Sequence, residues 1–246
     1  MKLRNFYYMV SDFEKNEVFA CGATFFDFMK FIVDKPENIL LLKAFFGDGK
    51  WNNDIYLDYV DADNMKELIN DDVYDYGDFC WVDYDDIKRI ENMNKMELAE
   101  LLYLGHMFQP LKEANMKWLN NKYVYTAHDD DFYSKIFMKN INDYKPVMHG
   151  KILDAMRGRK KHMEALPEEI VDYIFEHSRD GILFDFESIE FYDGKTFLDI
   201  YKLGKNYNYD AIYDVLKRKK WFTNMKIYLE YNSRNKKWKI HDEWKE

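Results

Sequence analysis

The chain reads ILFDFESIEFY over residues 182–192, DG at Asp193-Gly194, and KTFLDIYKL over residues 195–203. Apolar and polar side chains alternate in both runs, and Asp-Gly is a strong signal for a two-residue turn between antiparallel strands. An amphipathic helix is expected at 210–220, and a second hairpin is expected to join 221–231 to 237–241. The C-terminal region is therefore predicted to be an antiparallel β-β-α-β-β unit.

The chain before this region mixes helix and strand signals. Capping residues, or proline in the first turn, predict helices that begin near five positions: Thr24, Asp63, Asn94, Asp131 and Pro167. Runs of aromatic and β-branched residues predict strands at 5–10, 17–21, 39–46, 51–60, 73–84 and 123–127. The fold class expected is α+β, with a mixed α/β region at 1–156 and the antiparallel unit at 157–246. No internal repeat is visible in the sequence.

Composition narrows the functional classes. The 246 residues are 47% apolar and 33% charged, which is typical of a folded globular chain. The longest purely aliphatic run, residues 39–42, is too short to span a bilayer, and no secretory signal is visible. Cys21 and Cys80 alone cannot form a disulfide scaffold, so we expect a bacterial cytoplasmic location and no membrane partner.

Charge is distributed unevenly along the chain. Residues 48–91 hold twelve Asp and two Glu against four basic residues, a local charge of −10, while the whole chain carries −9. Residues 217–239 hold nine basic residues and one Glu. Such asymmetry bears on partners rather than on the fold.

The acidic segment is rich in tyrosine and tryptophan. Carboxylates mixed with large rigid rings are typical of a surface that binds a basic protein face, because charge speeds encounter and rings supply anchors. The alternative is a solvated acidic surface whose aromatic side chains point into the core. The residues predicted to bind a partner are Asp58, Asp61, Asp63, Asp71, Asp72, Tyr74, Asp75, Tyr76, Asp78 and Trp81.

Three stretches together resemble a known family. They read DFCWVD at 78–83, AELLYLGHM at 99–107 and YTAHDD at 125–130. They are similar to uncharacterised proteins of low-GC Gram-positive bacteria and their phages, which are sometimes labelled oxalate:formate antiporters. The resemblance covers residues 73–139. It implies a phage or mobile-element origin and assigns no catalytic residue, and the transporter label conflicts with the lack of a membrane span.

An enzyme is the alternative to a binding protein. His106, His128-Asp129 and Asp154 follow the order of ligands in a metal-dependent phosphohydrolase, where imidazole and carboxylate groups hold a metal that activates water. The competing interpretation places these residues in ordinary turns and helix ends. No nucleotide-binding glycine motif or serine nucleophile motif is present, so no cofactor is expected.

A third hypothesis is nucleic-acid binding through two basic clusters, at 157–162 and 217–221. Lysines at the end of a helix that interact with its dipole are the simpler explanation for the second cluster. The same clusters could attract the acidic segment of another copy, so a homo-oligomer is also considered. The function predicted from the sequence is a non-enzymatic antagonist that blocks a host nuclease or defence complex through its acidic, aromatic surface.

Overall fold

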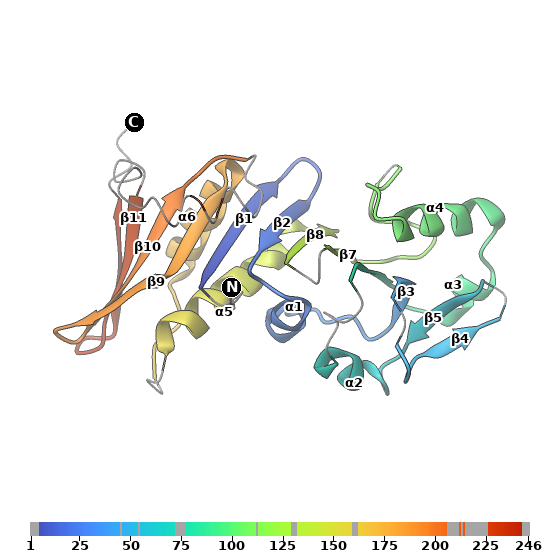
Figure 1. Ribbon diagram of the computed structural model, residues 1–246, viewed down its shortest axis with the longest axis horizontal. Helices are drawn as coiled ribbons and strands as arrows, with labels where there is room; N and C mark the ends of the chain where they lie inside the picture. The colour runs from blue at the N-terminus through green and yellow to red at the C-terminus, as the bar shows by residue number, and fades with distance from the viewer. Residues whose placement is uncertain are drawn as a thin grey trace.

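The computed structural model describes residues 5–44, 46–53, 55–71, 77–111, 113–128, 132–158, 162–205, 212, 214 and 226–242 (Figure 1). Helices and 3₁₀ turns pack on the faces of one large sheet. In chain order the described elements are β1 (Phe6–Asp12), β2 (Glu17–Cys21), α1 (Phe25–Phe31), β3 (Ile39–Lys43), β4 (Lys50–Asn52), β5 (Leu57–Val60), α2 (Met65–Asn70), β6 (Phe79–Asp83), α3 (Ile87–Glu91), α4 (Lys95–Gly105), β7 (Tyr123–His128), β8 (Tyr133–Met138), η2 (Ile141–Tyr144), α5 (Lys145–Arg157), α6 (Glu168–His177), η3 (Ser178–Asp180), β9 (Ile182–Tyr192), β10 (Lys195–Lys202), β11 (Lys226–Asn232) and β12 (Lys237–Asp242).

The sheet contains 12 strands in the order β12-β11-β10-β9-β1-β2-β8-β7-β6-β3-β5-β4. Every neighbouring pair is antiparallel. The fold class predicted from the sequence, α+β, is confirmed at this level. The β1–β2 and β7–β8 hairpins occupy the middle of the sheet, and β4 and β12 are its two edges.

Two layers cover the sheet. On the face that we call the first face, α1, α2, α5 and α6 contribute to a large apolar core. The aromatic rings of Phe28, Tyr123 and Tyr125 pack there, with Phe28 at 5.6 Å from Tyr123 and 5.5 Å from Tyr125 between ring centroids. On the second face, α3 and α4 cover strands near β6 and β7, while Ile212 packs in a separate cluster over β1 and β9.

The two central hairpins are related by an approximate twofold axis. Matching residues are 116 positions apart: Thr24 caps α1 as Asn140 caps η2, and Phe19 lies opposite Lys135 where β2 pairs with β8. Because Phe19 and Lys135 are equivalent positions in the two hairpins and also pair with each other, the axis passes between them. Six strands lie on each side of this axis, although the connections between the outer strands differ.

Two sequence predictions are wrong in this half of the chain. The helix expected after Asp131 is the strand β8, whose side chains alternate between the faces and pair with both β2 and β7. The single strand expected at 51–60 is instead the hairpin formed by β4 and β5. Pairing with β2 and β7 determines strand β8, whereas a short turn that the apolar pattern does not reveal divides residues 51–60 into β4 and β5.

The C-terminal hairpins β9–β10 and β11–β12 are confirmed, and the turn at Asp193-Gly194 lies where predicted. Of the helix expected at 210–220, the structure describes only Ile212 and Asp214, both helical, and the rest lies outside the described residues. The four C-terminal strands continue the common sheet, because β9 pairs with β1.

None of the helices in the described ranges has the length and apolar character needed to cross a membrane.

Candidate functional site

The β4–β5 hairpin lies at one edge of the sheet and ends in a short turn. The backbone N–H of Tyr56 donates to the carbonyl of Asn52 at 3.0 Å, and the N–H of Ile55 donates to the Asn52 side-chain oxygen at 3.2 Å. Tyr56 has φ = 57°, in the left-handed region that few tyrosines adopt. In this turn the Ile55 side chain is buried, whereas the Tyr56 side chain is exposed to solvent.

Two aromatic rings stand in solvent on this hairpin. Trp51 is 54% exposed and Tyr56 is 72% exposed. Their ring centroids are 6.3 Å apart with an interplanar angle of 67°, the edge-to-face arrangement that aromatic pairs prefer. Exposed rings of this size are the residues that most often anchor protein interfaces.

A carboxylate lies beside the rings. Asp58 is directly opposite Trp51 in the β4–β5 pair and opposite Leu41 of the first-face core in the β3–β5 pair, so Trp51 and Asp58 share the first face. Asp58 is half-buried, and this burial raises the pKa of its carboxyl above the usual value. Within the described residues its carboxylate forms no hydrogen bond or ion pair. We call Trp51, Tyr56 and Asp58 the hairpin site.

The lysine on the neighbouring strand β4 does not neutralise Asp58. Lys50 is opposite Tyr59, which packs on the second face, so Lys50 points to that side of the sheet. There it forms an ion pair with Asp61. The alternation of strand side chains thus separates the lysine from the hairpin site.

The predicted acidic surface is not one continuous patch. Asp58 is on the first face, whereas Asp61 and Asp78 form ion pairs with lysines on the second face, Asp78 with Lys43 at 2.6 Å. Asp63 and Asp71 are exposed just before and just after α2. The described carboxylates of this segment therefore lie on both sides of the sheet, and Asp61 and Asp78 are paired with lysines.

One predicted contact residue cannot reach a partner. Trp81 is fully buried and stacks on Tyr125 with centroids 5.6 Å apart and an interplanar angle of 4°. Its strand, β6, lies between β3 and β7 and is covered on both faces. The competing interpretation, aromatic side chains in the core, holds for Trp81. Asp72, Tyr74, Asp75 and Tyr76 lie outside the described residues.

The alternative metal site is not assembled in the described part of the chain. Asp154, on α5 of the first face, forms an ion pair with Lys30. His106 is the C-cap of α4 on the second face, and His128 stacks on Tyr133 at the end of β7. No three His, Cys, Asp or Glu side chains among the described residues converge as metal ligands, and Asp129 is not described.

His128 has charged neighbours that sequence reasoning did not combine. Its Nδ1 is 3.8 Å from Asp78 Oδ1. Burial lowers the pKa of His128, the Asp78 carboxylate opposes this effect, and the charges of Lys135 and Lys43 add to it. His128, Lys135 and Lys43 come from strands β7, β8 and β3, and Asp78 directly precedes β6, so only the strand order places them together.

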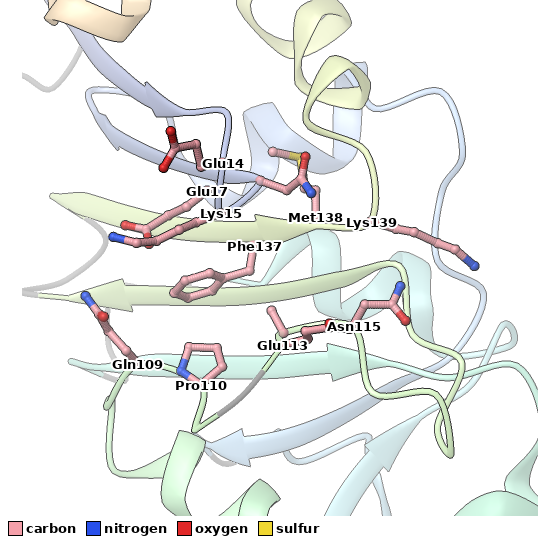
Figure 2. Close-up of a pocket in the computed structure, with 12 residues that line it drawn as sticks. Glu14, Lys15, Glu17, Gln109, Pro110, Glu113, Asn115, Phe137, Met138 and Lys139 are labelled. Carbon is pink, nitrogen blue, oxygen red and sulfur yellow. The ribbon is translucent and has the colours of Figure 1, made fainter.

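A cavity of about 540 Å³ opens on the second face (Figure 2). The β1–β2 turn forms one wall, the chain after α4 forms another, and Phe137 of β8 lies between them. Its lining carries both signs of charge, with Glu14, Glu17 and Glu113 against Lys15 and Lys139. This mixture favours no single ligand class, and the sequence could not predict a cavity that depends on β2–β8 pairing.

Two lysines of the basic C-terminal region lie at the opposite edge of the sheet. Lys237 and Lys239 are exposed on β12, whereas residues 159–161 and 217–221 are outside the described part of the chain.

Comparisons with protein-family models, with curated proteins and with solved structures find no match.

Proposed function

We propose that this protein is a non-enzymatic binding protein. Its β4–β5 hairpin binds the basic face of a partner protein. The observation that carries the proposal is the hairpin site: two exposed rings beside a carboxylate that lacks a counterion among the described residues. Trp51 and Tyr56 provide apolar anchoring area, and Asp58 provides charge complementarity. The proposed binding surface is thus narrower than the acidic stripe expected from the sequence.

Energetics favour the rings as the source of affinity. Truncation of a Trp or Tyr anchor costs about 2 kcal/mol or more at a typical interface, whereas exposed ion pairs contribute about 0–1 kcal/mol. The surrounding excess of acid mainly accelerates encounter with a cationic surface. Exposed Asp63 and Glu67 contribute to this field, while Asp61 and Asp78 are already paired with lysines.

The resemblance to proteins of Gram-positive bacteria and their phages supports an antagonist that blocks a host nuclease or defence complex, since such targets expose basic nucleic-acid-binding faces. We place this activity in the bacterial cytoplasm. Both cysteines, Cys21 and Cys80, are buried free thiols, which suits a reducing compartment.

A capture experiment tests the proposal. The protein is immobilised, exposed to lysate of a low-GC Gram-positive bacterium at low salt, and retained proteins are quantified by mass spectrometry. Trp51→Ala and Tyr56→Asn are the test variants, because asparagine tolerates the left-handed backbone at position 56 while removing the ring. We expect each variant to lose at least about tenfold of a specifically retained protein.

Matched controls come from other exposed aromatic residues. Phe108 is 52% exposed and Tyr192 is 76% exposed, and neither belongs to the hairpin, so Phe108→Ala and Tyr192→Ala should retain wild-type capture. Equal capture by the wild type and both hairpin variants, with all four variants folded, would remove the proposed function. Capture that does not weaken between low and high salt would contradict the charge component.

A further inference from the structure

We propose that the hairpin site receives an arginine side chain of the partner, with the guanidinium stacked on Trp51 and paired with Asp58. This inference rests on the proposed function and specifies its chemistry. It identifies the partner as a protein that presents a projecting arginine rather than a generally basic surface.

The arrangement of the rings supports a stacked cation. Trp51 and Tyr56 meet at 67°, so they form an open corner rather than a closed stack, and more than half of each residue is exposed. A guanidinium lies favourably over an indole face within about 6 Å of the ring centroid. Indole is the strongest of the protein rings for this contact.

The carboxylate supplies the second half of the contact. Directly opposed residues on antiparallel strands have Cβ atoms about 4.5–5.5 Å apart, and Asp58 is opposite Trp51 on the same face. A cation stacked on the indole therefore remains within reach of the Asp58 oxygens. Arginine fits both groups at once, because its planar fork can stack and donate two parallel hydrogen bonds, whereas the lysine ammonium is a compact, strongly hydrated charge.

In the described part of the chain, no cation of the protein occupies this position. The lysine of β4, Lys50, is held on the other face by Asp61. Asp58 is half-buried, and no cation among the described residues pairs with it. Loss of hydration without a partner is costly for a carboxylate, and an incoming guanidinium would relieve that cost.

The test uses two blocked pentapeptides as probes, Gly-Gly-Arg-Gly-Gly and the same peptide with citrulline, which keeps the shape of arginine but removes its charge. Binding to the full chain is followed by NMR through the indole N–H resonance of Trp51. That resonance is assigned as the one missing from Trp51→Phe. We expect the arginine peptide to shift it saturably, with an affinity at least about fivefold above that of citrulline.

Variants identify the carboxylate. Asp58→Asn should reduce the affinity for the arginine peptide at least about fivefold, while Glu190→Gln, a control at an exposed acid on β9, should not change it. Equal affinities for arginine and citrulline, or an unchanged affinity in Asp58→Asn, would overturn the inference. The two proposals can fail separately. If the hairpin variants lose partner capture but the protein binds the arginine and citrulline peptides equally, only this inference fails. If the protein prefers the arginine peptide but the hairpin variants capture the partner as well as the wild type does, the proposed function fails.

Discussion

Asp83 is a buried carboxylate held by backbone donors. The N–H of Lys122 donates to both of its oxygens, at 2.9 and 3.0 Å, and the N–H of Tyr123 donates to Oδ1 at 2.6 Å. Despite these bonds, which favour the ionised form, burial dominates and raises the pKa of Asp83 to about 6. The side chain thus ties the start of β7 to the end of β6 at an electrostatic cost near neutral pH.

This cost makes stability depend on pH. Because the folded pKa lies above the unfolded value of about 3.9, the folded state binds more protons between about pH 4 and pH 6. The free energy of unfolding should therefore fall as pH rises through this window, by up to about 3 kcal/mol from this residue. Urea unfolding at about pH 4.5 and pH 7.5 measures the change.

The control for Asp83 compares two substitutions. Asp83→Asn removes the titrating group, so its free energy of unfolding should change less than that of the wild type between the two pH values. Asp63→Asn, at an exposed position, should keep the wild-type dependence. A pH dependence in Asp83→Asn equal to that of the wild type would show that burial of this carboxylate is not the source.

At the scale of single elements, helix α5 approaches α1 through a glycine. A Cβ placed on Gly150 would be 2.2 Å from Phe31 Cδ1, far inside van der Waals contact. Lys151 on the next position forms an ion pair with Asp27, which also completes the capping box of α1 with Thr24. The close approach therefore joins the two helices that follow the two central hairpins.

Gly150→Ala should destabilise the protein although alanine is the better helix former. Overpacking typically costs about 1–3 kcal/mol, and the gain in helix propensity returns about 1 kcal/mol. Combining it with Phe31→Ala makes room for the new methyl group, so the double variant should lose less stability than the two single variants added together. Chemical denaturation of all four proteins gives this coupling energy, and additive losses would show that the two side chains do not meet.

Elements with strong local signals were predictable from the sequence. The capping box Asn94-x-x-Glu97 begins α4, Thr24 caps α1, and Asp193-Gly194 joins β9 to β10. Strand β8 was not, because Phe132, Ile136 and Phe137 fit a helical spacing and only pairing with β2 and β7 selects the extended form. Local chemistry determined the ends of elements better than it determined their type.

The hairpin site shows the same limit. Trp51, Tyr56 and Asp58 all lie in the acidic segment at 48–91, but Trp51 was predicted only as the first residue of one strand at 51–60 and not as a contact residue. Its exposure follows from the short connection that divides that run into β4 and β5 at the edge of the sheet. Trp81 has the same side-chain chemistry and the opposite environment, because β6 is an inner strand.

At the scale of the whole molecule, the two halves related by the approximate twofold axis pack their central hairpins in a similar way but differ at the outer edges of the sheet. Tyr7 and Tyr123 are 116 positions apart, and each contacts the helix that follows the other hairpin. The hydroxyl oxygens of Tyr7 and Tyr144 are 3.2 Å apart, and the ring centroids of Tyr123 and Phe28 are 5.6 Å apart. The equivalent outer edges, β4 and β12, carry the hairpin site and exposed lysines respectively. Sequence comparison of the halves does not reveal the relation, because geometry and burial are shared while residue identities are mostly not.

The predicted boundary near residue 157 makes a final test of how the sheet is held together. β1 pairs with β2 on one side and with β9 on the other, and Phe184 of β9 stacks on Tyr7 at 5.3 Å. A fragment of residues 1–156 would lose that partner strand and expose an unpaired, apolar edge. We expect it to aggregate and to unfold without a cooperative transition, as measured by size-exclusion chromatography and circular dichroism.

Co-expression with residues 157–246 provides the matching control, because the second fragment restores β9 and the strands beyond it. The two fragments should elute together at the position of the intact chain and melt cooperatively. A monomeric 1–156 fragment with a sharp melting transition would instead establish two independent domains. In that case the pairing of β1 with β9 would be a contact between domains and not a condition for folding, and the free edge of β1 would become a second surface available to a partner strand.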